Sequence, residues 1–146
     1  MTEQLTVFLE NRAGRVDEVL RILKDNQVNI FSASLADASD FGLLRMIVEE
    51  PEKAKNVLGQ NGIFAKVSPI VLVAVSHEIG GLYDAINLLT EAGISVEYMY
   101  GLSTYEKGAA IAIKTSNLEK TEQIFDTAEV PGVKLYTIEG LKALVK

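Results

Sequence analysis

The polar residues with the clearest chemistry lie in residues 9–16, which read Leu-Glu-Asn-Arg-Ala-Gly-Arg-Val. This segment follows an alternating apolar stretch typical of a strand and precedes an amphipathic stretch typical of a helix. A strand, a glycine loop and a helix N-terminus form an anion site, because the first N–H groups of a helix lack partners and its dipole is positive there. Asn11 adds a carboxamide that can donate and accept hydrogen bonds. These groups suit a small zwitterion such as an amino acid.

The composition indicates a globular protein and excludes several chemistries. The 146 residues, of which 48% are hydrophobic and 23% charged, suffice for one ordinary domain or two small ones. The absence of Cys excludes disulfides, thiolate nucleophiles and cysteine-bound zinc. A net charge of −6 without a basic stripe disfavours nucleic acid and anionic membranes. The first residues do not resemble a signal peptide, and the longest apolar run, residues 70–75, is too short to span a bilayer. We therefore expect a cytoplasmic protein without cofactor or metal.

The two halves of the chain share one hydrophobic pattern when they are shifted by 66 residues. The shift aligns Gly14 with Gly80 and Gly42 with Gly108, and no gap is needed from residue 5 to about residue 48. It also aligns strand positions Leu5, Val7 and Leu9 with Val71, Val73 and Val75. Few residues are identical, but unrelated segments would lose this phase. The pattern therefore predicts a duplicated module.

Each half is predicted to contain strand, helix, strand, strand, helix and strand. In the first half we expect these elements at residues 4–10, 15–26, 28–36, 43–49, 51–62 and from about 63. In the second half we expect them at 70–76, 81–92, 94–102, 108–114, 117–128 and 133–138, with Asn117 as an N-cap and Pro69 separating two strands. Residues 140–146 are left open and include a short terminal helix as one option. The order predicts an α+β fold with two ferredoxin-like modules, residues 1–68 and 69–146, each an antiparallel four-stranded sheet with two helices on one face.

Residues 10–16, followed by Val28-Asn29-Ile30 after one helix, closely resemble the ACT domain, a small regulatory module that binds amino acids. The similarity is clearest to the serine-sensing domain of phosphoglycerate dehydrogenases, in which an Asn-x-x-Gly loop and a strand Asn hold the effector. The resemblance assigns these roles to Asn11, Gly14 and Asn29. Leu9 stands where that family has a His, so serine is not carried over as the ligand. The whole chain is similar to stand-alone tandem ACT proteins, on the duplication and on residues 39–45 and 96–100.

We expect the ligand carboxylate to bind the N–H groups of residues 12–16, with Asn11 and Asn29 holding the ammonium group. The predicted site of the first module therefore comprises Asn11, Arg12, Ala13, Gly14, Arg15, Val16, Asn29 and Ile30. Asn11 has a simpler alternative role, because Asn often caps a turn before a helix. The second module carries His77 and Ser95 at the two Asn positions, so its recognition must differ. Its predicted secondary site comprises His77, Ile79, Gly80, Gly81, Leu82, Ser95 and Val96.

The sequence thus predicts a regulatory sensor that binds a free amino acid at the interface between modules, with unequal sites. His77 is the only histidine and has no Ser or Cys beside it by motif, which disfavours catalysis and metal binding. The alternative is a protein-interaction or regulatory-subunit module without its own ligand, and an enzyme is disfavoured. A second copy of the chain or an enzyme are the expected protein partners; nucleic acid and membrane are not.

Overall fold

The computed structural model describes residues 1–10, 12–37, 40–105 and 108–144, and the chain forms two compact units. We call Glu3–Ser68 module one, and Pro69–Lys146 together with Met1–Thr2 module two. Within the described ranges, no helix is long and apolar enough to cross a membrane.

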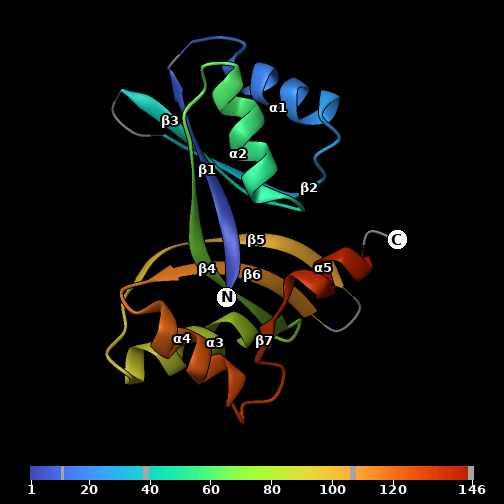
Figure 1. The fold of residues 1–146 in the computed structure, drawn as a ribbon. Helices are drawn as coiled ribbons and strands as arrows, with labels where there is room; N and C mark the ends of the chain where they lie inside the picture. The colour runs from blue at the N-terminus through green and yellow to red at the C-terminus, as the bar shows by residue number, and fades with distance from the viewer. Residues whose placement is uncertain (11, 38–39, 106–107, 145–146) are drawn as a thin grey trace. The chain divides into compact units, whose positions relative to one another are not determined.

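Module one has the predicted order of elements and a four-stranded sheet. Its sheet order is β2-β3-β1-β4, and β3 runs antiparallel to both β1 and β2. Helices α1 and α2 lie side by side on one face of the sheet (Figure 1). The elements are β1 (Thr2–Glu10), α1 (Arg15–Asp25), β2 (Ile30–Asp37), β3 (Phe41–Val48), α2 (Pro51–Gln60) and the first part of β4 (Ala65–Ser76). This arrangement confirms the ferredoxin-like prediction.

The core of module one follows from the two periodicities of its sequence. Alternate residues of β1, beginning with Leu5, are almost fully buried against the helices. On α1, Val19 and Leu23 are buried, and Ile22 completes the buried stripe at 7% exposure. Leu20 is 39% exposed, because it lies on the flank of the helix.

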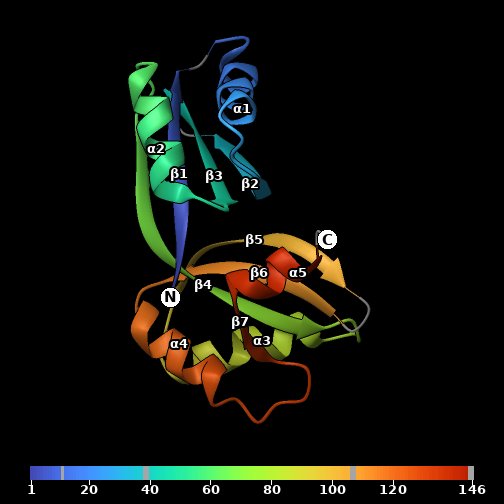
Figure 2. The same ribbon diagram turned by 45° about the vertical axis from the view of Figure 1, so that its right-hand side comes forward.

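Module two repeats the arrangement and adds a terminal helix. Its sheet order is β7-β4-β6-β5 with antiparallel pairing. The N-cap prediction is confirmed, because Asn117 Oδ1 accepts a hydrogen bond of 3.0 Å from the backbone N–H of Lys120. Helix α5 lies on the opposite face of the sheet from α3 and α4 (Figures 1 and 2). The elements after β4 are α3 (Gly81–Glu91), β5 (Val96–Tyr105), β6 (Gly108–Thr115), α4 (Leu118–Asp126), β7 (Lys134–Tyr136) and α5 (Ile138–Leu144).

Several strand boundaries differ from the prediction, and two of the differences have a clear physical reason. Strand β4 runs without a break through Pro69, which the sequence analysis treated as a separator. Proline suits an extended backbone, and pairing of β4 with β6 begins only at Val71, so this pairing does not require an N–H at Pro69. The last strand was expected at residues 133–138 but is limited to Lys134–Tyr136, because α5 begins at Ile138.

The strand registers support the duplication but correct its alignment. A bulge between Ile30 and Ser32 in β2 recurs 66 residues later between Val96 and Tyr98 in β5. A further irregularity between Gly101 and Ser103 in β5 has no counterpart in the register of β2. It adds one residue to β5, so that corresponding residues of β3 and β6 are 67 positions apart in the sequence rather than 66.

The gapless alignment of Gly42 with Gly108 was therefore wrong. Gly42 lies opposite Leu9 on β1, whereas Ala109 lies opposite Val75 on β4. Since Leu9 and Val75 correspond, Ala109 takes the place of Gly42 in module two.

Candidate functional site

A cavity of about 330 Å³ lies in module one, where the first turn of α1 meets the ends of β1 and β2. The strand register builds its floor, because Leu9, Gly42 and Asp37 lie in one row across β1, β3 and β2. Leu9 belongs to the core beneath the helices, so Asp37 emerges on the same helix-covered side of the sheet. The lining residues are Leu9, Glu10, Arg12, Arg15, Val16, Leu35, Ala36, Asp37 and Gly42.

The start of α1 presents backbone N–H groups toward this region. Gly14 is the N-cap residue with φ of 85°, a conformation that glycine adopts without strain, and it has no side chain to cap the helix. The hydrogen bond from Glu18 N to Gly14 O, at 3.0 Å, is the first of the helix. The N–H groups of the three residues before Glu18 therefore have no intrahelical partner and lie at the positive end of the helix dipole.

Arg15 places a cation at this helix end. Only 10% of its side chain is exposed, and its Nη1 donates a hydrogen bond of 2.8 Å to Glu18 Oε2. Its Nε is buried and has no hydrogen-bond partner among the residues that the structure describes. A buried donor without a partner costs about 1–3 kcal/mol, which an anion bound in the cavity would recover.

The rest of the cavity combines a carboxylate with apolar walls. Asp37 supplies an exposed carboxylate from the end of β2. At the rim, Arg12 Nε lies 3.3 Å from Glu10 Oε2, and both side chains are more than half exposed. The remaining lining residues carry only hydrocarbon side chains or none. The cavity thus offers a cationic end, an anionic group and an apolar surface within one small volume.

The structure brings together only part of the predicted first site. Arg12, Arg15 and Val16 line the cavity, and Ala13 and Gly14 form the exposed turn beside it. Asn11 lies outside the described residues. The predicted residues from the second strand are elsewhere: Asn29 precedes β2 and Ile30 pairs with Val48, at the other end of the sheet. Leu35 lies six positions after Asn29, a distance of about 20 Å along an extended chain.

Six cavity residues were not predicted from the sequence, namely Leu9, Glu10, Leu35, Ala36, Asp37 and Gly42. The consecutive strands predicted at residues 28–36 and 43–49 held a usable signal, since a short connection between antiparallel strands places the last residues of one strand beside the first of the next. The burial of the Arg15 guanidinium had no such signal, because it depends on packing between α1 and the sheet.

The corresponding loop of module two has the same glycine conformation at its helix N-cap but has no arginine at the equivalent positions. Gly80 repeats Gly14, with φ of 89° at the N-cap of α3. Counting from these glycines, Glu78 stands in the place of Arg12 and Gly81 in the place of Arg15. A side chain at Gly81 is excluded, because a Cβ there would collide with the backbone oxygen of Ser76. This loop therefore offers no guanidinium at the equivalent positions.

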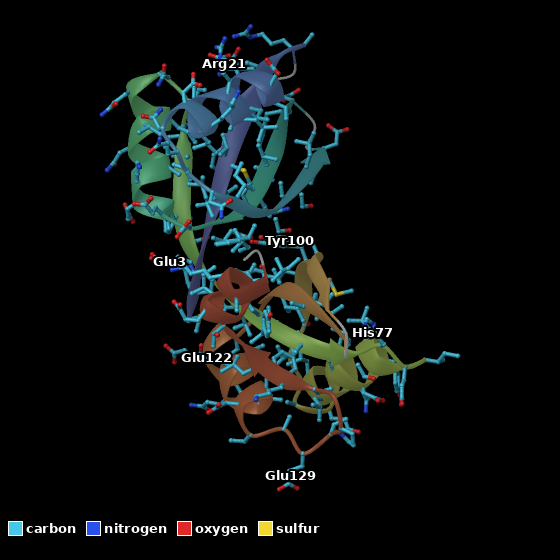
Figure 3. The ribbon with its side chains drawn as sticks, turned by 90° about the vertical axis from the view of Figure 1, so that its right-hand side faces the viewer. Glu3, Arg21, His77, Tyr100, Glu122 and Glu129 are labelled. Carbon is cyan, nitrogen blue, oxygen red and sulfur yellow. The ribbon has the colours of Figure 1, made fainter. Side chains whose placement is uncertain are left out.

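The predicted secondary site is also dispersed. His77 is exposed near the turn between β4 and α3 (Figure 3), and Ile79 is fully exposed in that turn. Ser95 exchanges hydrogen bonds with Ser116 at the other end of the sheet, where Val96 pairs with Thr115. Two cavities of module two, of about 390 and 840 Å³, lie beside β7 and contain none of the predicted residues. The described ranges hold no group of three His, Asp or Glu residues placed to bind a metal ion.

Comparison with known proteins identifies the fold and the family. The family model for an ACT domain pair matches residues 1–133. The solved structure of a protein from Bacteroides thetaiotaomicron is 30% identical and has a TM-score of 0.86, with 96% of this chain and 94% of that chain covered. No curated protein matches the chain.

More distant structures share the fold alone. The ligand-free regulatory subunit of aspartate kinase from Thermus thermophilus has a TM-score of 0.61 at 13% identity, over 88% of this chain and 93% of that one. The family match covers most of the sequence and agrees with the duplicated ferredoxin-like modules. The chain therefore belongs to the ACT domain pair family, which is a family of regulatory modules.

Proposed function

We propose that this protein is a non-enzymatic regulatory sensor that binds a free α-amino acid in the cavity at the start of α1. The observation that carries the proposal is the buried Nε of Arg15, which has no partner among the described residues and lies at the positive end of a helix. An amino-acid carboxylate supplies the missing acceptor and the negative charge together. Asp37 supplies a partner for the ammonium group.

In this proposal Asn29 does not contact the ligand that the cavity of the same module binds. Asn29 lies at the far end of the sheet from the cavity, so one ligand cannot contact both Asn29 and Arg15 of the same module. A ligand stabilises the conformation of the protein to which it binds more tightly, which is how binding becomes a regulatory signal. We propose that the two ACT domains of the chain are residues 1–68 and 69–146.

Partners follow from the family rather than from the cavity. A similar fold occurs in a protein named as a regulatory subunit of aspartate kinase. We infer that this chain likewise acts on a partner enzyme.

The proposal is tested by calorimetry of the full chain with the twenty amino acids, followed by two derivatives of the best ligand. The amide of that amino acid lacks the carboxylate, and its N-acetyl form lacks the ammonium group. We expect each derivative to bind about ten- to a hundredfold more weakly, since each loses a hydrogen bond to a charged group. If no amino acid binds, or if the amide binds as well as the free acid, the proposal is wrong.

An interaction role for the loop of module two is a second candidate function. Ile79 is fully exposed, and Leu82 and Tyr83 beside it are 38% and 68% exposed. Clustered exposed apolar side chains are typical of protein contacts. With Ile79→Asp we expect weaker self-association in sedimentation velocity and unchanged amino-acid binding. An unchanged sedimentation coefficient over a range of concentrations would argue against a contact between copies at this loop.

A further inference from the structure

The cavity of module one also carries information about the side chain of its ligand. After Arg15 and Asp37 are assigned to the carboxylate and ammonium groups, the charged residues left are Glu10 and Arg12, which pair with each other at the rim. Among the described residues, the other lining side chains on the helix-covered side of the sheet are apolar, namely Leu9, Val16 and Leu35, and Gly42 has no side chain. A polar ligand side chain placed there would lose hydrogen bonds to water and gain none from these hydrocarbon side chains. An aliphatic side chain would instead gain contact.

Leu35 and Gly42 together set the depth of this apolar part. Leu35 lies on the edge strand β2 and is 59% exposed, yet its Cδ1 lies only 3.5 Å from the position that a Cβ on Gly42 would occupy. The Leu35 side chain thus lies across the row that contains Gly42. The absence of a side chain at Gly42 leaves room above the sheet, and Leu35 limits that room toward the edge. The volume of about 330 Å³ is at the small end for ligand cavities.

Module two has the same fold without a leucine at the position of Leu35 and without a glycine at the position of Gly42. Leu35 lies opposite Leu44, and Gly101 lies opposite Ile111, the residue that replaces Leu44 in module two. Gly42 is replaced by Ala109, as the register shows. Module two therefore lacks the counterparts of Leu35 and Gly42 as well as the counterpart of Arg15.

We infer that the ligand is an amino acid with an aliphatic side chain, and that Leu35 and Gly42 determine its size. This inference rests on the proposed function. Both positions tolerate substitution: a Cβ on Gly42 would contact Leu35, Ala36 and Leu9 at 3.5–3.9 Å, which is ordinary van der Waals contact, and Leu35 belongs to no buried cluster. Gly42→Ala shortens the apolar part, and Leu35→Ala widens it.

The test measures dissociation constants of the full chain and both variants for alanine, valine, leucine, phenylalanine, asparagine and glutamate. We expect wild type to bind the three aliphatic amino acids best. In Gly42→Ala, the affinity for leucine relative to alanine should fall about tenfold. In Leu35→Ala, the affinity for phenylalanine relative to leucine should rise about tenfold. Leu20→Ala and Ala109→Gly are matched controls outside the cavity and should leave the order of affinities unchanged.

The outcomes distinguish a failure of the proposed function from a failure of the inference about the ligand side chain. If wild type binds no amino acid, both the proposed function and this inference are wrong. If wild type binds asparagine or glutamate best, the inference alone is wrong. The same holds if both cavity variants keep the wild-type order of affinities while their thermal midpoints show that they are folded.

Discussion

Replacing Arg15 by methionine is expected to weaken ligand binding while stabilising the ligand-free protein. Methionine keeps most of the hydrocarbon packing of the arginine stem but removes the guanidinium group. The substitution therefore removes the buried Nε, which has no partner among the described residues, and also the hydrogen bond from Nη1 to Glu18. These two losses act on stability with opposite signs.

The magnitudes decide the sign. Relief of the unpartnered buried donor is worth about 1–3 kcal/mol. Loss of the pair with Glu18 costs about 0.5 kcal/mol, because it is an (i, i+3) pair within one helix and the Glu18 side chain remains 29% exposed to water. The free energy of unfolding should therefore rise by about 1 kcal/mol, or roughly 3 °C in the thermal midpoint for a chain of this length. Ligand affinity should fall about ten- to a hundredfold, from the loss of a charge-assisted hydrogen bond.

Calorimetry and thermal unfolding of the same samples measure both effects. Arg21→Met is the matched control, because Arg21 is an exposed arginine of α1 (Figure 3) and its loss changes the net charge equally. Arg21→Met should leave affinity unchanged and stability within about 0.5 kcal/mol. If the two variants bind ligand equally well, Arg15 is not the carboxylate partner. If Arg15→Met is strongly destabilised, the guanidinium has a structural role and the reasoning from its free Nε fails.

Three further predictions concern a helix cap, two helical glycines and the ranking of the two predicted ligand sites. Asn117→Ala should lower the free energy of unfolding by about 1 kcal/mol, because it removes the side-chain cap of α4; an unchanged denaturation midpoint would refute the cap. Gly59→Ala should stabilise by about 0.5–1 kcal/mol, since it lies inside α2 with open space around it, whereas Gly81→Ala should destabilise because its Cβ would collide with a backbone carbonyl; chemical denaturation of the two variants should give opposite shifts. Asn11→Ala should weaken amino-acid binding by about tenfold or more and His77→Ala by distinctly less, and calorimetry showing the reverse order would mean that the two sites are wrongly ranked.

The sequence alone determined most of the elements and their order, apart from the joining of two predicted strands in β4 and the terminal helix α5. The alternation of Leu5, Val7 and Leu9 and the helical spacing of Val19 and Leu23 reflect local periodicities that burial against one face imposes. The cap at Asn117 could be predicted from the sequence because a cap is a contact between residues that are close in sequence. The loop at Gly14 was also predicted, since a glycine between a strand and a helix marks a backbone requirement that acts locally.

Tertiary structure alone decided which residues meet at the cavity. The row of Leu9, Gly42 and Asp37 depends on pairing between strands that are far apart in sequence, and a shift of one residue would turn each side chain to the other face. The extra residue of β5 near Gly101 likewise shifts the alignment of β6 with β3 by one residue, so that Ala109 and not Gly108 corresponds to Gly42. The exposure of a long side chain such as that of Arg15 is set by the elements packed around it, and no local pattern of residues encodes that packing.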